Sequence, residues 1–225
     1  MPASQQKTMT ASAVEPLLRF TEQHNIPLSD VLQGTNLSEH KLKDDRISIS
    51  SFDQLINNIA RITQCENIGF IAGQGLKLES LSLLGFLLSG SKTGRDALVT
   101  MRRYYMLLSD TPSPEIFITK NEVKVLYHTS PGNELAMRAR AELIATGIQT
   151  LGRRFGSKSY QPLKIGFKHS KPRYHDELER YFGVDIIYNQ EQSWISFAGE
   201  HVDQPLKHTN PVLYQALRNQ AESIM

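Results

Sequence analysis

Cysteine is almost absent from the sequence: Cys65 is the only one in 225 residues. A single cysteine excludes an internal disulfide, and such usage is typical of a reducing compartment, so we expect a cytoplasmic location. Long apolar runs are also missing, because no stretch approaches the ~18 consecutive apolar residues that span a bilayer. Residues 1–13 lack the apolar core of a secretory signal. We therefore expect no membrane partner.

An excess of positive charge is missing as well. Lys and Arg number 25 and Asp and Glu 23, which gives a formal net charge of +2. A chain that holds DNA by itself is more often markedly basic, because it must neutralise phosphates. The charge balance therefore predicts that this stretch is not a DNA-contacting part.

Motifs for nucleophilic or phosphate chemistry are missing too. The segment Leu88-Ser89-Gly90-Ser91 lacks the glycine that precedes the serine of a nucleophile elbow. The glycines of the segment 68–75 do not have the spacing of a phosphate loop, and no Lys-Ser or Lys-Thr pair follows them. Cys65 stands beside Glu66, and a carboxylate raises the pKa of a thiol instead of activating it. We expect no enzymatic activity and no cofactor.

A metal site is not expected either. The chain has seven histidines, of which His169 and His175 lie closest to each other on a segment with other polar residues. Their spacing across Pro172 is not the i, i+4 pairing of a helical zinc site, and no carboxylate stands at a matching offset. A structural role is the favoured interpretation of His169, because it keeps the parity of the buried residues on the preceding strand.

The first half of the chain predicts helices. Residues 1–11 are small and polar and predict a loose tail, followed by a helical subdomain over 12–110. The clearest helix has apolar residues three and four apart: Phe52, Leu55, Ile56, Ile59 and Ile62. Thr93-x-x-Asp96 is a capping signal for another helix, which continues to the segment Asp110–Pro114. The two prolines of that segment favour an extended connection and mark a subdomain boundary.

The second half predicts a sheet, over residues 115–206. A hairpin of strands is expected at 116–118 and 123–127, a third strand at 163–167, and a second hairpin formed by 185–188 and 194–197. A long helix, 133–155, must cover one face of this sheet. Residues 207–225 predict a C-terminal helix leading to a linker. The fold class is therefore α+β: a helical N-terminal half followed by a mixed sheet of about five strands under a long helix.

An ordered series of motifs links the chain to a known family. Phe167, His169 and Pro172 are followed by Tyr181-Phe182-Gly183, two apolar strands and Gln204-Pro205-Leu206. Upstream lie the segments LGFLLSGSKTGRDALVTMRRYYMLLSD, at 84–110, and LGRRF, at 151–155. The series, which covers the chain from about Leu17 onward, resembles the effector-binding domain that precedes the helix-turn-helix half of AraC/XylS-type transcriptional regulators.

This resemblance implies a function and its partners. It implies a ligand-sensing and dimerisation domain that binds a small organic effector (an amino acid, a fatty acid or another organic acid), acts as a homodimer and meets DNA only through a C-terminal half. The sequence ends at Met225, where the linker to such a half would begin. A stand-alone small-molecule-binding or protein-interaction module without DNA binding is the alternative, and a cofactor-free enzyme is a third class.

Six residues are candidates for contacting the effector: Arg102, Tyr104, Arg154, His169, Tyr174 and Trp194. Arginine suits an acidic effector because its planar fork meets a carboxylate through two bonds. For the lysines and arginines between 153 and 173, a solvated sheet face is the favoured interpretation, and contact with an acidic effector is the alternative. Tyr105 keeps the spacing of a core residue, whereas Tyr104 is expected to border a pocket between the helical half and the sheet. Trp194 is expected in the core or, less favourably, in the pocket wall.

Overall fold

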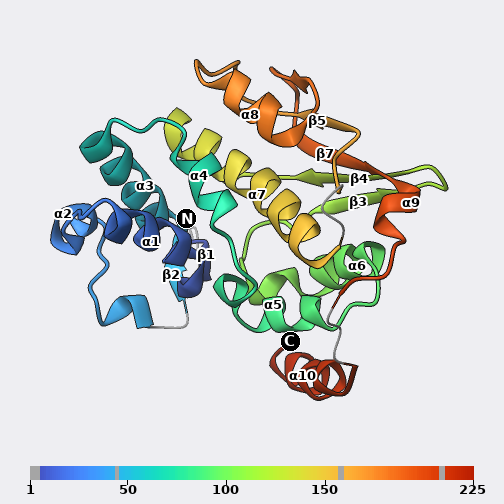
Figure 1. The fold of residues 1–225 in the computed structure, drawn as a ribbon. Coiled ribbons are helices and arrows are strands. Elements are labelled where there is room, and N and C mark those ends of the chain that lie inside the picture. Colours follow the sequence, from blue (N-terminus) through green and yellow to red (C-terminus); the bar gives the residue numbers. More distant parts are fainter. Residues whose placement is uncertain (1–5, 44–45, 157–159, 208–210) are drawn as a thin grey trace, which may run out of the picture.

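The computed structural model describes residues 6–43, 46–156, 160–207 and 211–225. The first part of the chain is helical (Figure 1) and opens with a small sheet, in which strand β1 (Thr8–Thr10) pairs antiparallel with β2 (Arg46–Ser48). Its helices are η1 (Ala11–Val14), α1 (Glu15–Gln23), α2 (Leu28–Leu32), η2 (Lys41–Lys43), α3 (Ile49–Thr63), α4 (Ile68–Gln74), η3 (Glu79–Leu81), α5 (Ser82–Ser89), α6 (Gly94–Tyr104) and η4 (Tyr105–Leu107). The expected loose tail thus contains a strand, because Arg46, Asp110 and the backbone at Leu108 hold Thr8 and Thr10 in place.

The second part builds a five-stranded mixed sheet in the order β3-β4-β7-β5-β6. Its strands are β3 (Glu115–Ile118), β4 (Glu122–Tyr127), β5 (Lys164–Gly166), β6 (Ile186–Ile187) and β7 (Ser193–Ala198). Its helices are α7 (Glu134–Phe155), α8 (His175–Phe182), α9 (Gly199–Val202) and the terminal α10 (Pro211–Ile224). The predicted α+β class, the β3–β4 hairpin and the long helix are confirmed.

The second predicted hairpin is wrong. Strand β6 pairs parallel with β5, not with β7, and β7 pairs antiparallel with β4 and β5. The reason is that α8 connects β5 to β6 as a crossover, so the two strands run in the same direction. A polar segment between two apolar runs is typical of a hairpin turn. Here, however, β5 lies between β6 and β7 in the sheet.

Helix α7 is shared by two hydrophobic cores. It begins at the N-cap Asn133, whose side chain accepts a hydrogen bond from Ala136 N at 2.8 Å. Ala141 and Ala145 pack into the core between α7 and the sheet, together with Val125, Ile165 and Ile195. Ala139 packs instead with α1, α3 and α4, in the core of the helical half. Alternate faces of one helix therefore hold both halves of the protein together.

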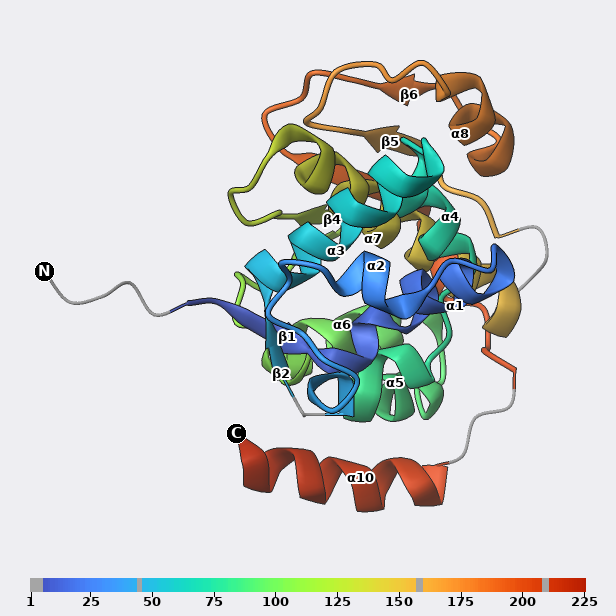
Figure 2. The ribbon, with the colours of Figure 1, turned by 90° about the vertical axis from the view of Figure 1, so that its left-hand side faces the viewer.

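Helix α10 lies outside this arrangement, below α5 (Figure 2). It contributes Ala221 to a third, small core with Leu84 and Leu87 of α5 and Tyr104 of α6. The Tyr104 hydroxyl donates a hydrogen bond of 2.5 Å to Glu222 Oε1, which also pairs with Arg103 at 2.7 Å. The last helix is thus fixed to α5 and α6 by both apolar and polar contacts.

Among the described helices, none is by itself long and apolar enough to cross a bilayer. Helix α4 and the following η3–α5 segment reach the necessary length and composition only together, as a pair bent by 114°.

We predict that Gly69→Ala destabilises the protein through the α4–α7 contact. A Cβ at Gly69 would collide with the carbonyl oxygen of Ala139, which is backbone and cannot rotate away. Overpacking of this kind costs about 1–3 kcal/mol. The control is Gly75→Ala at the end of α4, where the nearest atom, Ala72 O, lies 3.5 Å from the added Cβ. Urea unfolding curves should show a lowered midpoint for the first variant alone; equal midpoints would contradict this packing.

Candidate functional site

A cavity of about 160 Å³ lies where the helical half meets the sheet. Helices α3, α5, α6 and α7 and strand β4 supply its walls. Most of the lining is apolar, for example Phe52, Leu76, Leu84, Met101, Val125 and Ile148. Cavities of about 150 Å³ with such walls accept a small apolar molecule. The space is therefore suited to an organic ligand that is mostly hydrophobic.

A smaller space of about 100 Å³ adjoins the first one. Both are lined by Leu88 of α5, Met101 of α6, and Ile148 and Leu151 of α7. The smaller lobe continues along Ala97, Leu98 and Phe155 and ends near Lys207. We call the two spaces the first and second lobes, because these four side chains line both of them.

The polar groups of the first lobe gather at one end. Ser130 and Arg140 are both buried, with exposed fractions of 9% and 7%. Arg140 Nη2 donates to the carbonyl oxygen of Ser130, and Arg140 Nε lies 3.2 Å from Asp53 Oδ1. The hydroxyl of Ser130 has no hydrogen-bond partner among the described residues. A buried donor without a partner is costly, so a ligand that brings a polar group to this end of the cavity would be favoured.

Burial dominates the electrostatics of the Asp53–Arg140 pair. It raises the pKa of Asp53 to about 6, although the neighbouring Arg140 charge opposes the rise. Burial also lowers the pKa of Arg140, and Asp53 partly restores it. The pair joins α3 to α7 beside Gly132, whose missing side chain leaves room for both charged groups. It therefore ties the helical half to the long helix at the polar end of the cavity.

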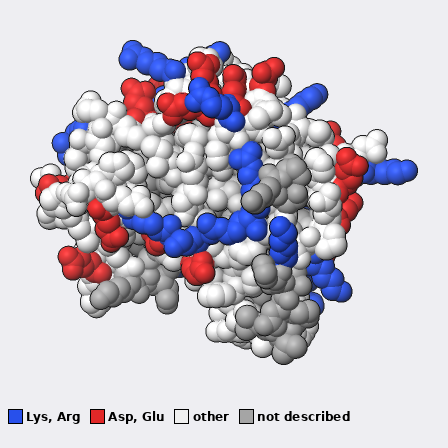
Figure 3. All heavy atoms as spheres, viewed as in Figure 1, with Lys and Arg blue, Asp and Glu red and all other residues white. Residues whose placement is uncertain are grey.

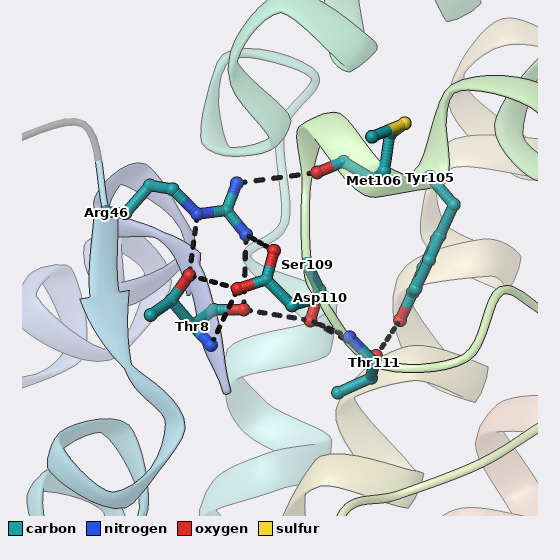
Figure 4. A network of polar contacts seen from close by, with 7 residues as sticks. All are labelled: Thr8, Arg46, Tyr105, Met106, Ser109, Asp110 and Thr111. Carbon is teal, nitrogen blue, oxygen red and sulfur yellow. Dashed lines mark hydrogen bonds and ion pairs between the residues drawn. The ribbon is translucent and has the colours of Figure 1, made fainter. Parts of the chain in front are cut away.

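A network of polar contacts joins β1 and β2 to the segment after α6, which includes residues of the cavity wall (Figure 4). Arg46 Nη2 lies 2.7 Å from Asp110 Oδ1, and Arg46 Nε donates to the Thr8 hydroxyl at 2.7 Å. The hydroxyls of Ser109 and Tyr105 each lie within 3.1 Å of the Thr111 hydroxyl. Tyr105, Ser109 and Thr111 line the cavity. The segment expected to be an extended boundary is thus a fixed part of the cavity wall.

None of the six residues proposed from sequence lines either lobe. Arg102 and Arg154 are exposed on α6 and α7. Trp194 is half-buried on the sheet face opposite the α7 core, where it lies over Gly166, and Lys124 Nζ is 4.0 Å from the centre of its ring. Only His169 and Tyr174 come together, and they do so around a residue of α7 that the sequence did not nominate.

The two neighbouring tyrosines exchange their expected positions. Tyr104 is 1% exposed and packs against α10, whereas Tyr105 lines the cavity. The α-helix ends at Tyr104 and continues as the tighter η4, which turns Tyr105 away from the position that regular helical spacing predicts.

His169 and Tyr174 meet at Glu142, which is fully buried. The Tyr174 hydroxyl donates to the two carboxyl oxygens at 2.8 and 3.0 Å. Burial raises the pKa of Glu142 to about 8, against the opposing effects of Tyr174 and Arg138. Burial also lowers the pKa of His169 to about 4. Both groups are therefore mostly uncharged near pH 7, and their contact of 3.7 Å is not an ion pair.

The tautomer of His169 fits this interpretation. Its Nδ1 lies 2.9 Å from the carbonyl oxygen of Ser170, so Nδ1 carries the proton and Nε2 is an acceptor. Nε2 is buried without a hydrogen-bond partner and faces the Glu142 carboxyl group, which holds a proton at neutral pH. This cluster fixes the loop before α8 onto α7, the structural role favoured for His169 from the sequence.

Among the described residues, one group of side chains has ligating atoms close together. Atoms of His175, Asp176 and Glu179 on α8 lie within 4.8 Å of one another, and Asp176 already pairs with His175 at 2.8 Å. Asp176 is exposed, and such groups are common on protein surfaces, so we assign no metal to them.

Arg140, Ser130 and Asp53 were missed in the sequence. Each had a weak signal: Arg140 and Asp53 stand among apolar residues of amphipathic helices, and Ser130 precedes Pro131 in a turn. Nothing local indicates that three segments so far apart along the chain share one site.

The sequence and the fold of the chain have known relatives. The profile described as "Arabinose-binding domain of AraC transcription regulator, N-term" matches residues 26–206. The ornithine utilization regulator of Pseudomonas aeruginosa is 22% identical over 181 residues, which cover 80% of this chain and 53% of that protein. The crystal structure of the transcriptional regulator CdpR from Pseudomonas aeruginosa superposes with a TM-score of 0.69 at 14% identity, covering 92% of this chain and 61% of CdpR. The chain thus spans about half the length of the curated relative that it matches.

We predict that Glu142→Gln reduces the dependence of stability on pH. A carboxyl group with a raised pKa in the folded state binds its proton more tightly than in the unfolded state, where the value is 4.5. The free energy of unfolding should therefore fall as pH rises towards about 8, by at most about 1.4 kcal/mol per pH unit. Unfolding midpoints measured between pH 6 and 8 should fall less in Glu142→Gln than in the parent. Glu134→Gln, at an exposed position of α7, is the control and should keep the parent slope.

Proposed function

The chain belongs to the family of N-terminal arabinose-binding domains of AraC transcription regulators, and from this premise we propose that it is the ligand-sensing half of such a regulator. The observation that carries the proposal is the apolar cavity between the helical half and the sheet. Its walls include α5 and α6, and these same helices hold α10, the last described element of the chain. A small organic effector in the cavity would thus act on the helix from which an attached DNA-binding half continues.

Leu84 connects the cavity directly to α10. Its side chain lines the first lobe and belongs to the core that contains Ala221 of α10. Gly90, at the end of α5, lies so close to Tyr214 of α10 that an added Cβ would clash with its ring. A shift of α5 on effector binding would therefore move α10. The effector controls the DNA-binding half only through its difference in affinity for the two arrangements.

We propose that contact with DNA belongs to the attached half. Figure 3 shows Lys and Arg in a band across one face, with Asp and Glu gathered above it and at its left, so both signs occur on that face. This distribution agrees with the net charge of +2 and differs from the single-sign surface that holds phosphates. By analogy with the family, the regulator acts in the cytoplasm as a homodimer and is not an enzyme. Sedimentation equilibrium of the chain tests the dimer.

We predict that a panel of small organic acids, amino acids and sugars contains a ligand that raises the melting temperature of the chain. A ligand at 100 times its dissociation constant adds ~2.7 kcal/mol to the free energy of unfolding. Leu88→Trp should abolish the shift, because Leu88 lines both lobes. Phe86→Trp is the matched control on α5, since Phe86 is 45% exposed.

Two results would contradict the sensor function. One is the absence of any shift across the panel; the other is a shift that Leu88→Trp and Phe86→Trp preserve equally. The chain alone should fail to retard DNA in a gel. Ligand-dependent retardation should appear once a helix-turn-helix half is joined after Met225, whereas ligand binding without that response would favour a stand-alone binding module.

A further inference from the structure

Resting on the proposed function, we propose that the effector is a monocarboxylic acid with a flexible apolar body, held with its carboxylate at Ser130 and Arg140 and its body along the two lobes. This identifies a class of ligand that differs from the sugar after which the family is described. It also differs from the diamino acid after which the ornithine utilization regulator is named.

The lining of the cavity is unsuited to a sugar. A pentose carries a hydroxyl group on nearly every carbon, and each one loses its water on entering the cavity. Beyond the polar end, the walls of the first lobe are formed by side chains such as Leu84, Met101 and Ile144, which cannot form hydrogen bonds to hydroxyl groups. A sugar would therefore leave most of its hydroxyls buried without partners.

The charges at the cavity favour an anion. Among the described residues that line the two lobes there is no Asp or Glu. The nearest carboxyl group, that of Asp53, already faces Arg140. An ammonium group would thus find no counter-ion of its own. The fully charged side chains of the lining are Arg140 in the first lobe and Lys207 at the end of the second, and both are cations.

Ser130 and Arg140 form the site for the carboxylate. The bonds that Arg140 makes to Ser130 and Ala136 use Nη2 and Nε, so Nη1 stays available for a ligand oxygen. The Ser130 hydroxyl is buried without a partner among the described residues and can donate to the same carboxylate. Hydrogen bonds between charged groups are stronger than neutral ones, and the buried position adds to this.

A carboxylate at Nη1 would share the Arg140 guanidinium with Asp53, whose Oδ1 lies 3.2 Å from Nε. A second negative charge at the same guanidinium favours the protonated form of the buried Asp53 carboxyl group. Burial already raises the pKa of this carboxyl group to about 6, so the protonation needs little further change. Because Asp53 lies on α3 and Arg140 on α7, its protonation would weaken the tie between those helices and couple binding to the position of the helical half.

The shape of the cavity favours an elongated body. The two lobes, of about 160 and 100 Å³, are separated by side chains that line both. One of them is Met101, whose unbranched side chain adapts its shape readily. A straight apolar chain that displaces Met101 would fill both lobes, whereas a compact ring would fill only the first. Octanoate and decanoate are the probes that match this description.

The test is calorimetric titration of the 225-residue chain with octanoate, decanoate, methyl decanoate, L-arabinose and L-ornithine, below the micelle concentrations. We expect decanoate to bind at least about tenfold more tightly than its methyl ester, and neither arabinose nor ornithine to bind. Equal affinities for the acid and the ester, or tighter binding of arabinose or ornithine, would overturn the proposal.

Ser130→Ala separates ligand binding from stability. The variant removes a hydroxyl that has no partner in the described structure, so the unfolding midpoint without ligand should stay the same or rise. The affinity for decanoate should fall at least about fivefold. Ser113→Ala, at an exposed position outside both lobes, is the matched control. A lower midpoint with unchanged affinity would show that Ser130 is structural and would overturn the carboxylate site.

Ala97→Phe tests the position of the apolar body. Ala97 lines the second lobe, so a larger side chain there should weaken binding of decanoate more than that of hexanoate. Val99→Phe is the control on the same helix, because Val99 is 51% exposed. An equal effect on both chain lengths would place the body elsewhere.

The panel also separates this inference from the proposed function. If another class of ligand raises the melting temperature and Leu88→Trp abolishes that effect, the sensor function stands and the carboxylic acid is wrong. If no ligand of any class acts through the cavity, both proposals fall.

Discussion

The contact of α7 with both halves of the protein is the constraint on which the rest depends. One face of this helix packs on the five-stranded sheet, and another approaches α4 so closely at Gly69 and Ala139 that no side chain fits between the backbones. A helix held so tightly on two sides cannot shift by itself. The cavity lies on the side of α7 that faces α5 and α6.

The two buried ionisable residues Arg140 and Glu142 of α7 differ in their charge. Glu142 is mostly uncharged near pH 7 because burial outweighs the opposing effect of the Tyr174 hydroxyl, and its contacts with Tyr174 and His169 join α7 to the loop before α8. Arg140, two residues away, remains charged. Its partner is Asp53, whose pKa burial raises to about 6, so this carboxylate is protonated more easily than an exposed one. The first cluster is closed and structural, whereas the second can accept another anion. Such a difference within one helix separates a fold-determining site from a candidate binding site.

Prediction from sequence was strongest where neighbouring residues decide the structure. The long helix was expected at 133–155 and spans Glu134–Phe155, and the β3–β4 hairpin was expected from the strands at 116–118 and 123–127. Prediction was weakest where distant segments compete. The apolar run at 185–188 could pair with β7 or with β5, because its residues suit either neighbour. The crossover through α8 places it beside β5. Tyr104 and Tyr105 were exchanged because a turn of 3-10 helix rotates one side chain relative to the other.

By itself, the sequence determined the α+β class, the long helix, the balanced charge and, through an ordered series of motifs, the family. These properties follow from local periodicity and from short segments, so they can be predicted without the tertiary structure. Only the tertiary structure decided which residues surround the cavity. Asp53, Ser130 and Arg140 come from α3, a turn and α7, and their proximity arises from the packing of whole helices. Periodicity shows which side of a helix is buried, but it does not show which buried polar group will face another.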